Sequence, residues 1–138
     1  MKPINIFDVA GRAMAAQQVR LNTVASNMAN ANTVATTPEE AYRAMRPVFE
    51  TVYAGTSGAG RGVATVDTVG IARSDGTPDK RFQPHHPLAD KDGYVYAANV
   101  DTNEELVDML EASRQYQNNI EVLATAKSLM LKTISIGK

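Results

Sequence analysis

Apolar and small side chains recur with helical spacing near the start of the chain. Within residues 5–33 they alternate at intervals of four and three, the spacing of a coiled-coil seam along one helix face. The seam comprises Ala10, Met14, Gln17, Leu21, Val24, Met28 and Ala31. Asn5 is a suitable N-cap residue. The asparagine-rich residues 27–33 lower the helix propensity, so we expect the helix to fray or end there.

Residues 101–136 predict a second, longer helix. Thr102 and Glu105 have the spacing of a capping box, and Gly137 is a natural stop. One seam comprises Leu106, Met109, Ser113, Tyr116, Ile120, Leu123, Lys127, Met130 and Ile134, and an adjacent seam comprises Leu110, Gln117, Ala124 and Leu131. Two adjacent seams make a wide apolar stripe, so we expect this helix to have more than one neighbour.

The pattern between the two helical segments is different. Residues 46–53 and 63–72 are rich in Val, Thr and aromatic side chains, which predicts two strands joined by the glycine-rich loop 55–62. Residues 74–92 are rich in proline, aspartate and other charged residues, and we expect them to be irregular. A turn then leads into a short predicted strand at 94–97.

These elements predict a mainly α fold with a small β insert, in which long N- and C-terminal helices pack in a coiled-coil-like manner. We divide the chain into an N-terminal assembly helix (1–34), a β-rich or irregular middle (35–100) and a C-terminal assembly helix (101–138). Ordering a helix backbone costs more free energy than burying one seam returns. We therefore expect the isolated chain to have mobile ends that order only when several helices pack together.

Composition excludes several classes of function. The 138 residues favour one small domain, and 14 Lys and Arg against 15 Asp and Glu give no basic signal for nucleic acid. The absence of cysteine excludes disulfides, thiolate metal sites and cysteine nucleophiles. We expect neither a membrane span of ~20 apolar residues nor a cleaved secretory signal, because the first residues lack a continuous apolar segment.

The glycine loop matches the sequence pattern of a phosphate-binding loop only in part. Gly55 and Gly60 satisfy G-x-x-x-x-G, but Arg61 and Gly62 stand where a P-loop needs lysine and then serine or threonine. The loop also follows no clear strand–helix unit. A flexible surface loop therefore explains it better than a nucleotide site.

Two other segments have weak metal-binding patterns. His85 and His86 are adjacent, so in an extended segment their side chains point in opposite directions, and no zinc motif accompanies them. The segment from Asp90 to Gly93 lacks the further acidic ligands of a calcium loop and is better explained as a turn. We expect no catalytic, cofactor-binding or metal-binding residue in this chain.

The apolar seams allow two interpretations. An apolar stripe is usually the core of its own domain. Here the stripes lie at the two extremes of the chain and the insert is too small to cover both, which favours an assembly interface. The asparagines Asn22, Asn27, Asn30 and Asn32 are equally compatible with two roles. They could fix the register between packed helices, or they could face solvent near a fraying helix end.

Four segments carry a family resemblance. Residues 21–33 (LNTVASNMANANT) resemble the N-terminal signature of bacterial flagellar rod, hook and hook-associated proteins, and residues 112–120 (ASRQYQNNI) resemble their C-terminal signature. Within that family, residues 87–96 (PLADKDGYVY) and 126–133 (AKSLMLKT) are similar to a short basal-body rod member. The resemblance covers both ends of the chain, whereas residues 34–83 match no pattern of the family.

The resemblance implies a structural role. Such proteins are exported unfolded by the flagellar type III apparatus without a cleaved signal and fold in the periplasm. They form the proximal rod, the drive shaft between the MS ring and the hook, in which terminal helices pack into concentric layers. The implied partners are other copies, other rod proteins, the rod–MS ring adaptor and the MS ring. No nucleic acid and no direct membrane insertion are implied.

Within this interpretation we expect the seams to supply cohesion between subunits. The expected interface residues are Leu21, Val24, Met28, Leu106, Met109, Tyr116, Ile120, Leu123 and Met130, with Asn27 and Asn30 setting register. Two other classes remain open from the pattern alone. One is a cytoplasmic coiled-coil adaptor or another rod or hook family member, and the other is a small hydrolase or metal enzyme that uses His85 and His86.

Overall fold

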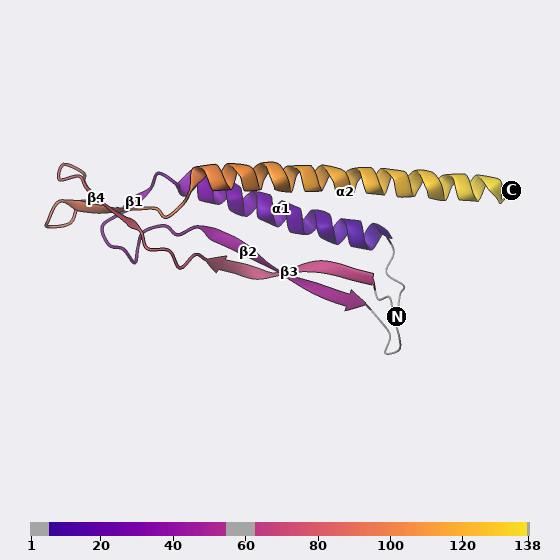
Figure 1. The fold of residues 1–138 in the computed structure, drawn as a ribbon, viewed down its shortest axis with the longest axis horizontal. Helices are drawn as coiled ribbons and strands as arrows, with labels where there is room; N and C mark the ends of the chain where they lie inside the picture. The colour runs from indigo at the N-terminus through magenta and orange to yellow at the C-terminus, as the bar shows by residue number, and fades with distance from the viewer. Residues whose placement is uncertain (1–5, 55–62, 138) are drawn as a thin grey trace.

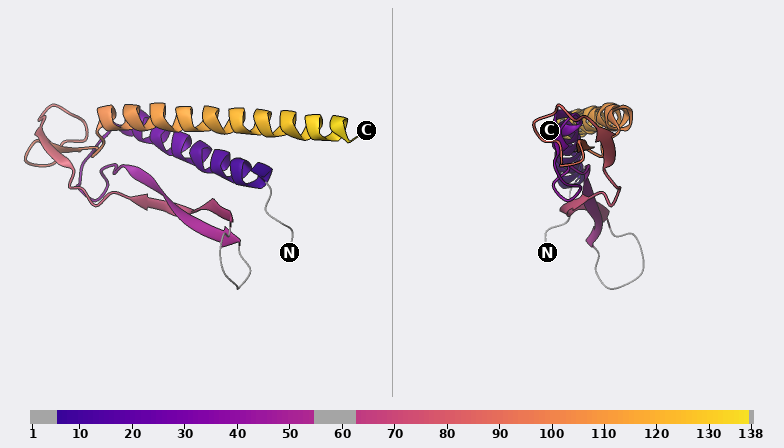
Figure 2. Two further views of the ribbon diagram at one scale, coloured as in Figure 1. Left: turned by 45° about the vertical axis from the view of Figure 1, so that its right-hand side comes forward. Right: turned by 90° about the vertical axis from the view of Figure 1, so that its left-hand side faces the viewer.

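The structure, a computed structural model, describes residues 6–54 and 63–137. The elements in chain order are α1 (Ile6–Asn30), β1 (Val34–Ala35), β2 (Met45–Ala54), β3 (Val63–Arg73), β4 (Asp79–Phe82), β5 (Tyr94–Ala97) and α2 (Thr102–Ile136). The molecule is elongated: α1 and α2 run antiparallel, the β2–β3 hairpin follows the other side of α1, and a small sheet lies at one end (Figure 1). The two further views in Figure 2 show the same order of layers.

Helix α1 follows its prediction closely. It ends at Asn30, inside the asparagine-rich run that was expected to stop it, while the predicted cap Asn5 lies outside the described residues. The chain leaves the helix through a tight turn in which the Ala31 amide donates to the Met28 carbonyl and the Thr33 hydroxyl donates to the Asn30 carbonyl. These local bonds satisfy carbonyls that the helix itself leaves without partners.

Helix α2 has the predicted length, but the predicted capping box is wrong. The N-cap is Asp101, whose carboxylate accepts hydrogen bonds from the backbone amides of Asn103 and Glu104. Thr102 is already inside the helix, and the Glu105 side chain does not reach back to the helix start. The Asp101 carboxylate also complements the positive end of the helix dipole.

The β2–β3 hairpin confirms the two longest predicted strands, each extended by one or two residues. The strands pair antiparallel from Met45 with Arg73 to Ala54 with Val63, and the register shifts between Val48 and Phe49. Such a bulge increases the local twist of the hairpin. The glycine loop that joins the strands, to which the phosphate-binding interpretation applied, lies outside the described residues.

The second sheet is only partly predicted. Its strand order is β1–β5–β4, with both pairs antiparallel. Strand β5 matches its predicted range, whereas β4 lies in the segment that was expected to be irregular, and that expectation is wrong for Asp79–Phe82. The turn before β5 is confirmed: Asp90 accepts from the amides of Asp92 and Tyr94, and Gly93 has a φ of 81°. Glycine adopts this left-handed conformation without strain.

The buried core is thin and consists mostly of small side chains. Its apolar members among the described residues are Ala10, Ala16, Val24, Ala41, Ala44, Val95, Ala97, Ala98 and Ala112. Alanine lets backbones approach closely but buries little apolar area, so each such residue contributes little hydrophobic free energy. Four polar side chains in the described part of the chain are also buried: Thr23, Asn27, Thr65 and Glu105. Neither described helix combines the length and the apolar character that a bilayer crossing requires.

Candidate assembly surface

Helix α2 leaves a long row of apolar side chains in solvent. We call the outer stripe the row of exposed apolar residues Leu106, Leu110, Ile120, Ala124 and Leu131, which recur at helical spacing on one side of α2 with the exposed Gln117 between Leu110 and Ile120. Leu110 and Leu131 are 64% and 58% exposed. An apolar row of this length on one chain is typical of an interaction surface.

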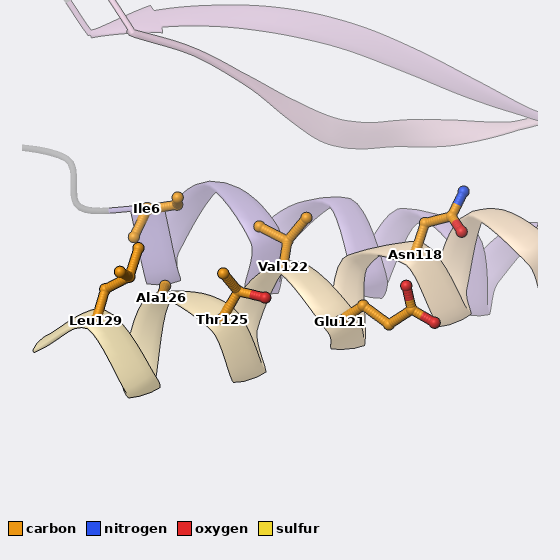
Figure 3. A pocket seen from close by; sticks show the side chains of 7 residues that line it. All are labelled: Ile6, Asn118, Glu121, Val122, Thr125, Ala126 and Leu129. Carbon is orange, nitrogen blue, oxygen red and sulfur yellow. The ribbon is translucent and has the colours of Figure 1, made fainter. Parts of the chain in front are cut away.

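A second apolar side of α2 faces a groove beside the start of α1. The groove encloses about 410 Å³ and is lined by Ile6 from α1 and by Asn118, Glu121, Val122, Thr125, Ala126 and Leu129 from α2. Figure 3 shows the side chains of Ile6 and Leu129 next to each other at one end of the groove, with Val122 further along it. Leu129 is 60% exposed, so α1 covers this side of α2 only in part.

The predicted seam of α2 divides between two sides of the helix. Met109, Tyr116 and Leu123 are half-buried, in step with the buried Ala112 that packs inside the subunit. Leu106, Ile120 and Met130 are exposed. Over each heptad an α-helix falls about 20° short of two full turns, so a seam continued over nine positions drifts around the helix.

The predicted interface residues of α1 also occupy different environments. Leu21 and Met28 are half-buried, whereas Val24 is 2% exposed and therefore packed inside its own subunit. Asn30 donates to the Ser26 carbonyl one turn earlier in its own helix. Whether these residues contact a neighbouring subunit stays a prediction.

Asn27 is not solvent-facing, because it is fully buried where α1, α2 and β2 meet. Its amide nitrogen donates to the Met45 carbonyl (2.8 Å) and to Glu105 Oε2 (3.0 Å), while its amide oxygen accepts from the Met45 amide (2.8 Å) and the Tyr42 hydroxyl (3.0 Å). The side chain thus pairs with the Met45 peptide through both a donor and an acceptor. Of the two roles considered for this asparagine, the solvent-facing one is wrong.

Charged side chains surround Asn27 and connect the same three elements. Arg46 of β2 lies 3.0 Å from Glu104, 3.3 Å from Glu105 and 2.8 Å from Asp108. Arg20 of α1 lies 2.9 Å from Asp108. We call Arg20, Asn27, Arg46, Glu105 and Asp108 the polar junction. Acidic residues at the start of α2 therefore bind both α1 and β2.

Glu105 is the member of the polar junction whose burial costs the most free energy, because its charged side chain is 0% exposed. Oε2 accepts from Asn27, but Oε1 has no hydrogen bond to any part of the chain that the structure describes. The Arg46 guanidinium at 3.3 Å is its ion-pair partner without good hydrogen-bond geometry. A buried carboxylate without a cation is strongly destabilising, so Arg46 is essential to this arrangement.

The histidines and the acidic turn show no sign of a shared site. His85 is exposed, and the Nδ1 atom of His86 accepts a hydrogen bond from the Leu88 amide in its own loop. Within residues 6–54 and 63–137, no group of three or more His, Asp or Glu side chains is arranged to hold a metal ion. The arrangement of the described residues supports contacts between helices and offers no assembled reaction centre.

Comparisons with known proteins agree with this picture. The family model "Flagella basal body rod protein" matches residues 7–34, and the model "Flagellar basal body rod FlgEFG protein C-terminal" matches residues 91–136. The flagellar basal-body rod protein FlgC of Yersinia enterocolitica is 47% identical over 139 residues. FlgC of Salmonella typhimurium strain LT2 is 44% identical, and FlgC of Escherichia coli O157:H7 is 46% identical. In all three comparisons the match covers 100% of both chains.

Proposed function

The chain belongs to the FlgC family of flagellar basal-body rod proteins, and from this premise we propose that it forms part of the proximal rod. It is a structural subunit of the flagellar basal body and not an enzyme. Copies of this chain would form part of the drive shaft that transmits torque from the MS ring towards the hook. Heterologous contacts between subunits produce such a helical tube when the rotation from one subunit to the next does not close into a ring.

The exposed apolar surface of α2 is the observation that carries the proposal. In its C-terminal half, Leu123 lies on the side towards α1, Ile120 and Leu131 lie on the outer stripe, and Val122 and Leu129 lie on the groove side. Leu123 is half-buried in the single subunit, whereas the other four side chains are exposed. Exposed apolar side chains on two sides of one helix are typical of surfaces that other elements cover. Neighbouring subunits would supply the missing cover.

We assign the interface to the predicted residues together with the outer stripe. Leu21 and Met28 of α1 and the predicted residues of α2 would contact neighbouring helices, with coiled-coil-like packing between subunits. Val24 and Asn27 would act from inside the subunit by fixing how α1 lies. In this scheme residues 1–34 and 101–138 are the assembly helices, and residues 35–100 form the outer, partner-specific region.

The proposal also specifies partners and location. Partners are further copies of the chain, other rod proteins, the rod–MS ring adaptor and the MS ring, with the flagellar type III apparatus as exporter. The rod would lie in the periplasm, and the chain would reach it without a cleaved signal. The balanced net charge of −1 supports neither nucleic acid nor an anionic membrane as a partner.

Helicity should increase when subunits assemble. From Met130 onward all α2 side chains of the described residues are exposed, so little tertiary packing stabilises that end of the helix in a single chain. We expect circular dichroism of dilute monomer to show less helix per residue than assembled material. Equal helicity in both states would contradict the proposed role of assembly in ordering the helix ends.

Deletion with complementation tests the proposed place in the rod. We expect a strain without this chain to lack rod and hook, to retain the MS ring and to be non-motile. Expression of the chain in that strain should restore rod, hook and motility, seen by electron microscopy of purified basal bodies and by motility assays. Normal basal bodies in the deletion strain would contradict the proposal and favour a coiled-coil adaptor.

A further inference from the structure

We propose that the polar junction is a positioning lock: it holds the β2–β3 hairpin at one position along the helix pair and closes that pair at one end. The lock is a property of the single chain. Its consequence for assembly, a fixed geometry between the hairpin and the outer stripe, rests on the proposed function. Tests on the free chain therefore separate failure of the lock from failure of the rod assignment.

The pairing of Asn27 with Met45 gives the lock its specificity. The side-chain amide donates to the Met45 carbonyl and accepts from the Met45 amide, each over 2.8 Å, as a neighbouring strand would. Strand β2 begins at Met45, so this pair fixes the origin of the hairpin on α1. A shift of the hairpin by one residue would break both bonds and would leave buried polar groups without partners, which is costly.

Glu105 and Arg46 extend the lock to α2. Glu105 accepts from the same Asn27 amide, so one side chain of α1 binds both β2 and α2. Arg46 follows Met45 in β2 and binds three acidic residues in the first two turns of α2, Glu104, Glu105 and Asp108. The three elements are therefore connected pairwise, and movement of any one breaks bonds to the other two.

The position of the lock explains why the helix pair is tight at only one end. The buried residues of α2 are Glu105 and Ala112, both in its first eleven residues. At the other end the helix axes diverge in both Figure 1 and Figure 2, and the groove beside Ile6 lies between them. Closure at the junction leaves the opposite end of α2 free to meet neighbouring subunits.

Another bond between α1 and the hairpin serves as an internal comparison. Arg12 donates to both carboxylate oxygens of Asp67 at 2.7 Å, but the two side chains are 47% and 44% exposed. Exposed ion pairs contribute little to stability because water screens them. We therefore assign the positioning role to the polar junction, whose members Asn27 and Glu105 are fully buried, and not to this pair.

Distance measurements on labelled protein test the lock directly. The chain contains no cysteine, so Thr51→Cys in β2 and Gln115→Cys in α2 provide the only two attachment sites for spin labels. Pulsed electron–electron double resonance on the full chain should give one narrow distance distribution. Asn27→Leu, which keeps the side-chain size and removes all four hydrogen bonds, should broaden that distribution. The matched control Asn22→Leu changes a more accessible asparagine of the same helix and should leave it narrow.

Conservative variants separate positioning from folding. Glu105→Gln retains an oxygen that accepts from Asn27 and should keep the narrow distribution, whereas Glu105→Leu should broaden it. Tyr42→Phe keeps the ring and removes one bond to Asn27, so the Met45 amide should exchange about two- to tenfold faster with helicity unchanged. A narrow distribution in Asn27→Leu at native helicity would overturn the proposal. Unchanged exchange of Met45 in Tyr42→Phe would overturn it too.

Discussion

Replacing Arg46 by methionine should lower the free energy of unfolding by about 3 kcal/mol or more, because it leaves the buried Glu105 carboxylate without its cation. Methionine keeps much of the length of the arginine side chain, so lost packing contributes little to the change. Arg46 also bridges Glu104 and Asp108, and the loss of that bridge adds to the effect. Urea denaturation of the two purified proteins, followed by circular dichroism, gives the difference.

A double-mutant cycle separates the free-energy cost of the unpaired charge from the cost of lost packing. The variant carrying Arg46→Met and Glu105→Met together should recover much of the lost stability, because an apolar pair can replace a buried ion pair at little cost. Arg12→Met removes an exposed arginine from the Arg12–Asp67 pair and should cost less than about 1 kcal/mol. Equal losses in Arg46→Met and Arg12→Met would show that burial of Glu105 has no energetic consequence.

The elements that the sequence predicts well are those with long periodic patterns. Helix α2 spans Thr102–Ile136 and helix α1 ends at Asn30, both close to expectation, because seams over seven or more positions specify a helix without tertiary information. The capping residue at α2 is different. Asp101 and Thr102 are both good N-cap residues at adjacent positions, and local sequence does not decide between them.

Strand β4 could not be predicted from its own residues. Asp79, Lys80, Arg81 and Phe82 are all exposed and show no alternation of apolar and polar side chains. Contacts with β5 hold the strand instead. Phe82 packs edge-on against the Tyr94 ring at 5.1 Å, and the Lys80 ammonium lies 4.0 Å from the centre of that ring. Strand formation here depends on the partner strand, as is common for sheet edges.

The polar junction was also beyond sequence analysis, although its members stood out singly. Asn27 and Glu105 are 78 residues apart in the chain, and Glu105 fitted a capping box that the structure does not contain. Asn27 binds α2 and β2 inside its own subunit, and a role of the asparagines in setting register between subunits stays a prediction. A single sequence contains no signal that pairs these two positions.

Leu123→Asp should abolish incorporation into the rod, and with it motility, while export of the chain continues. Leu123 is half-buried in the single subunit, so an aspartate there can still reach water and the fold should survive. Once neighbouring helices surround α2, the carboxylate loses that water without gaining a partner, at a cost of several kcal/mol per subunit. Because every copy carries the same substitution, the cost recurs at each equivalent contact in the helical tube.

Matched variants show whether the effect comes from the buried charge. Arg114→Asp introduces the same carboxylate at an exposed position of α2 that belongs neither to the outer stripe nor to the groove, and Leu123→Met keeps an apolar side chain of similar volume. Both should restore motility in the deletion strain, whereas Leu123→Asp should appear in the export fraction but not in purified basal bodies. If a strain that carries only Leu123→Asp is motile, Leu123 is not part of the interface. Loss of motility with Arg114→Asp as well would show that a carboxylate anywhere on α2 blocks assembly, and would contradict the specific role of Leu123.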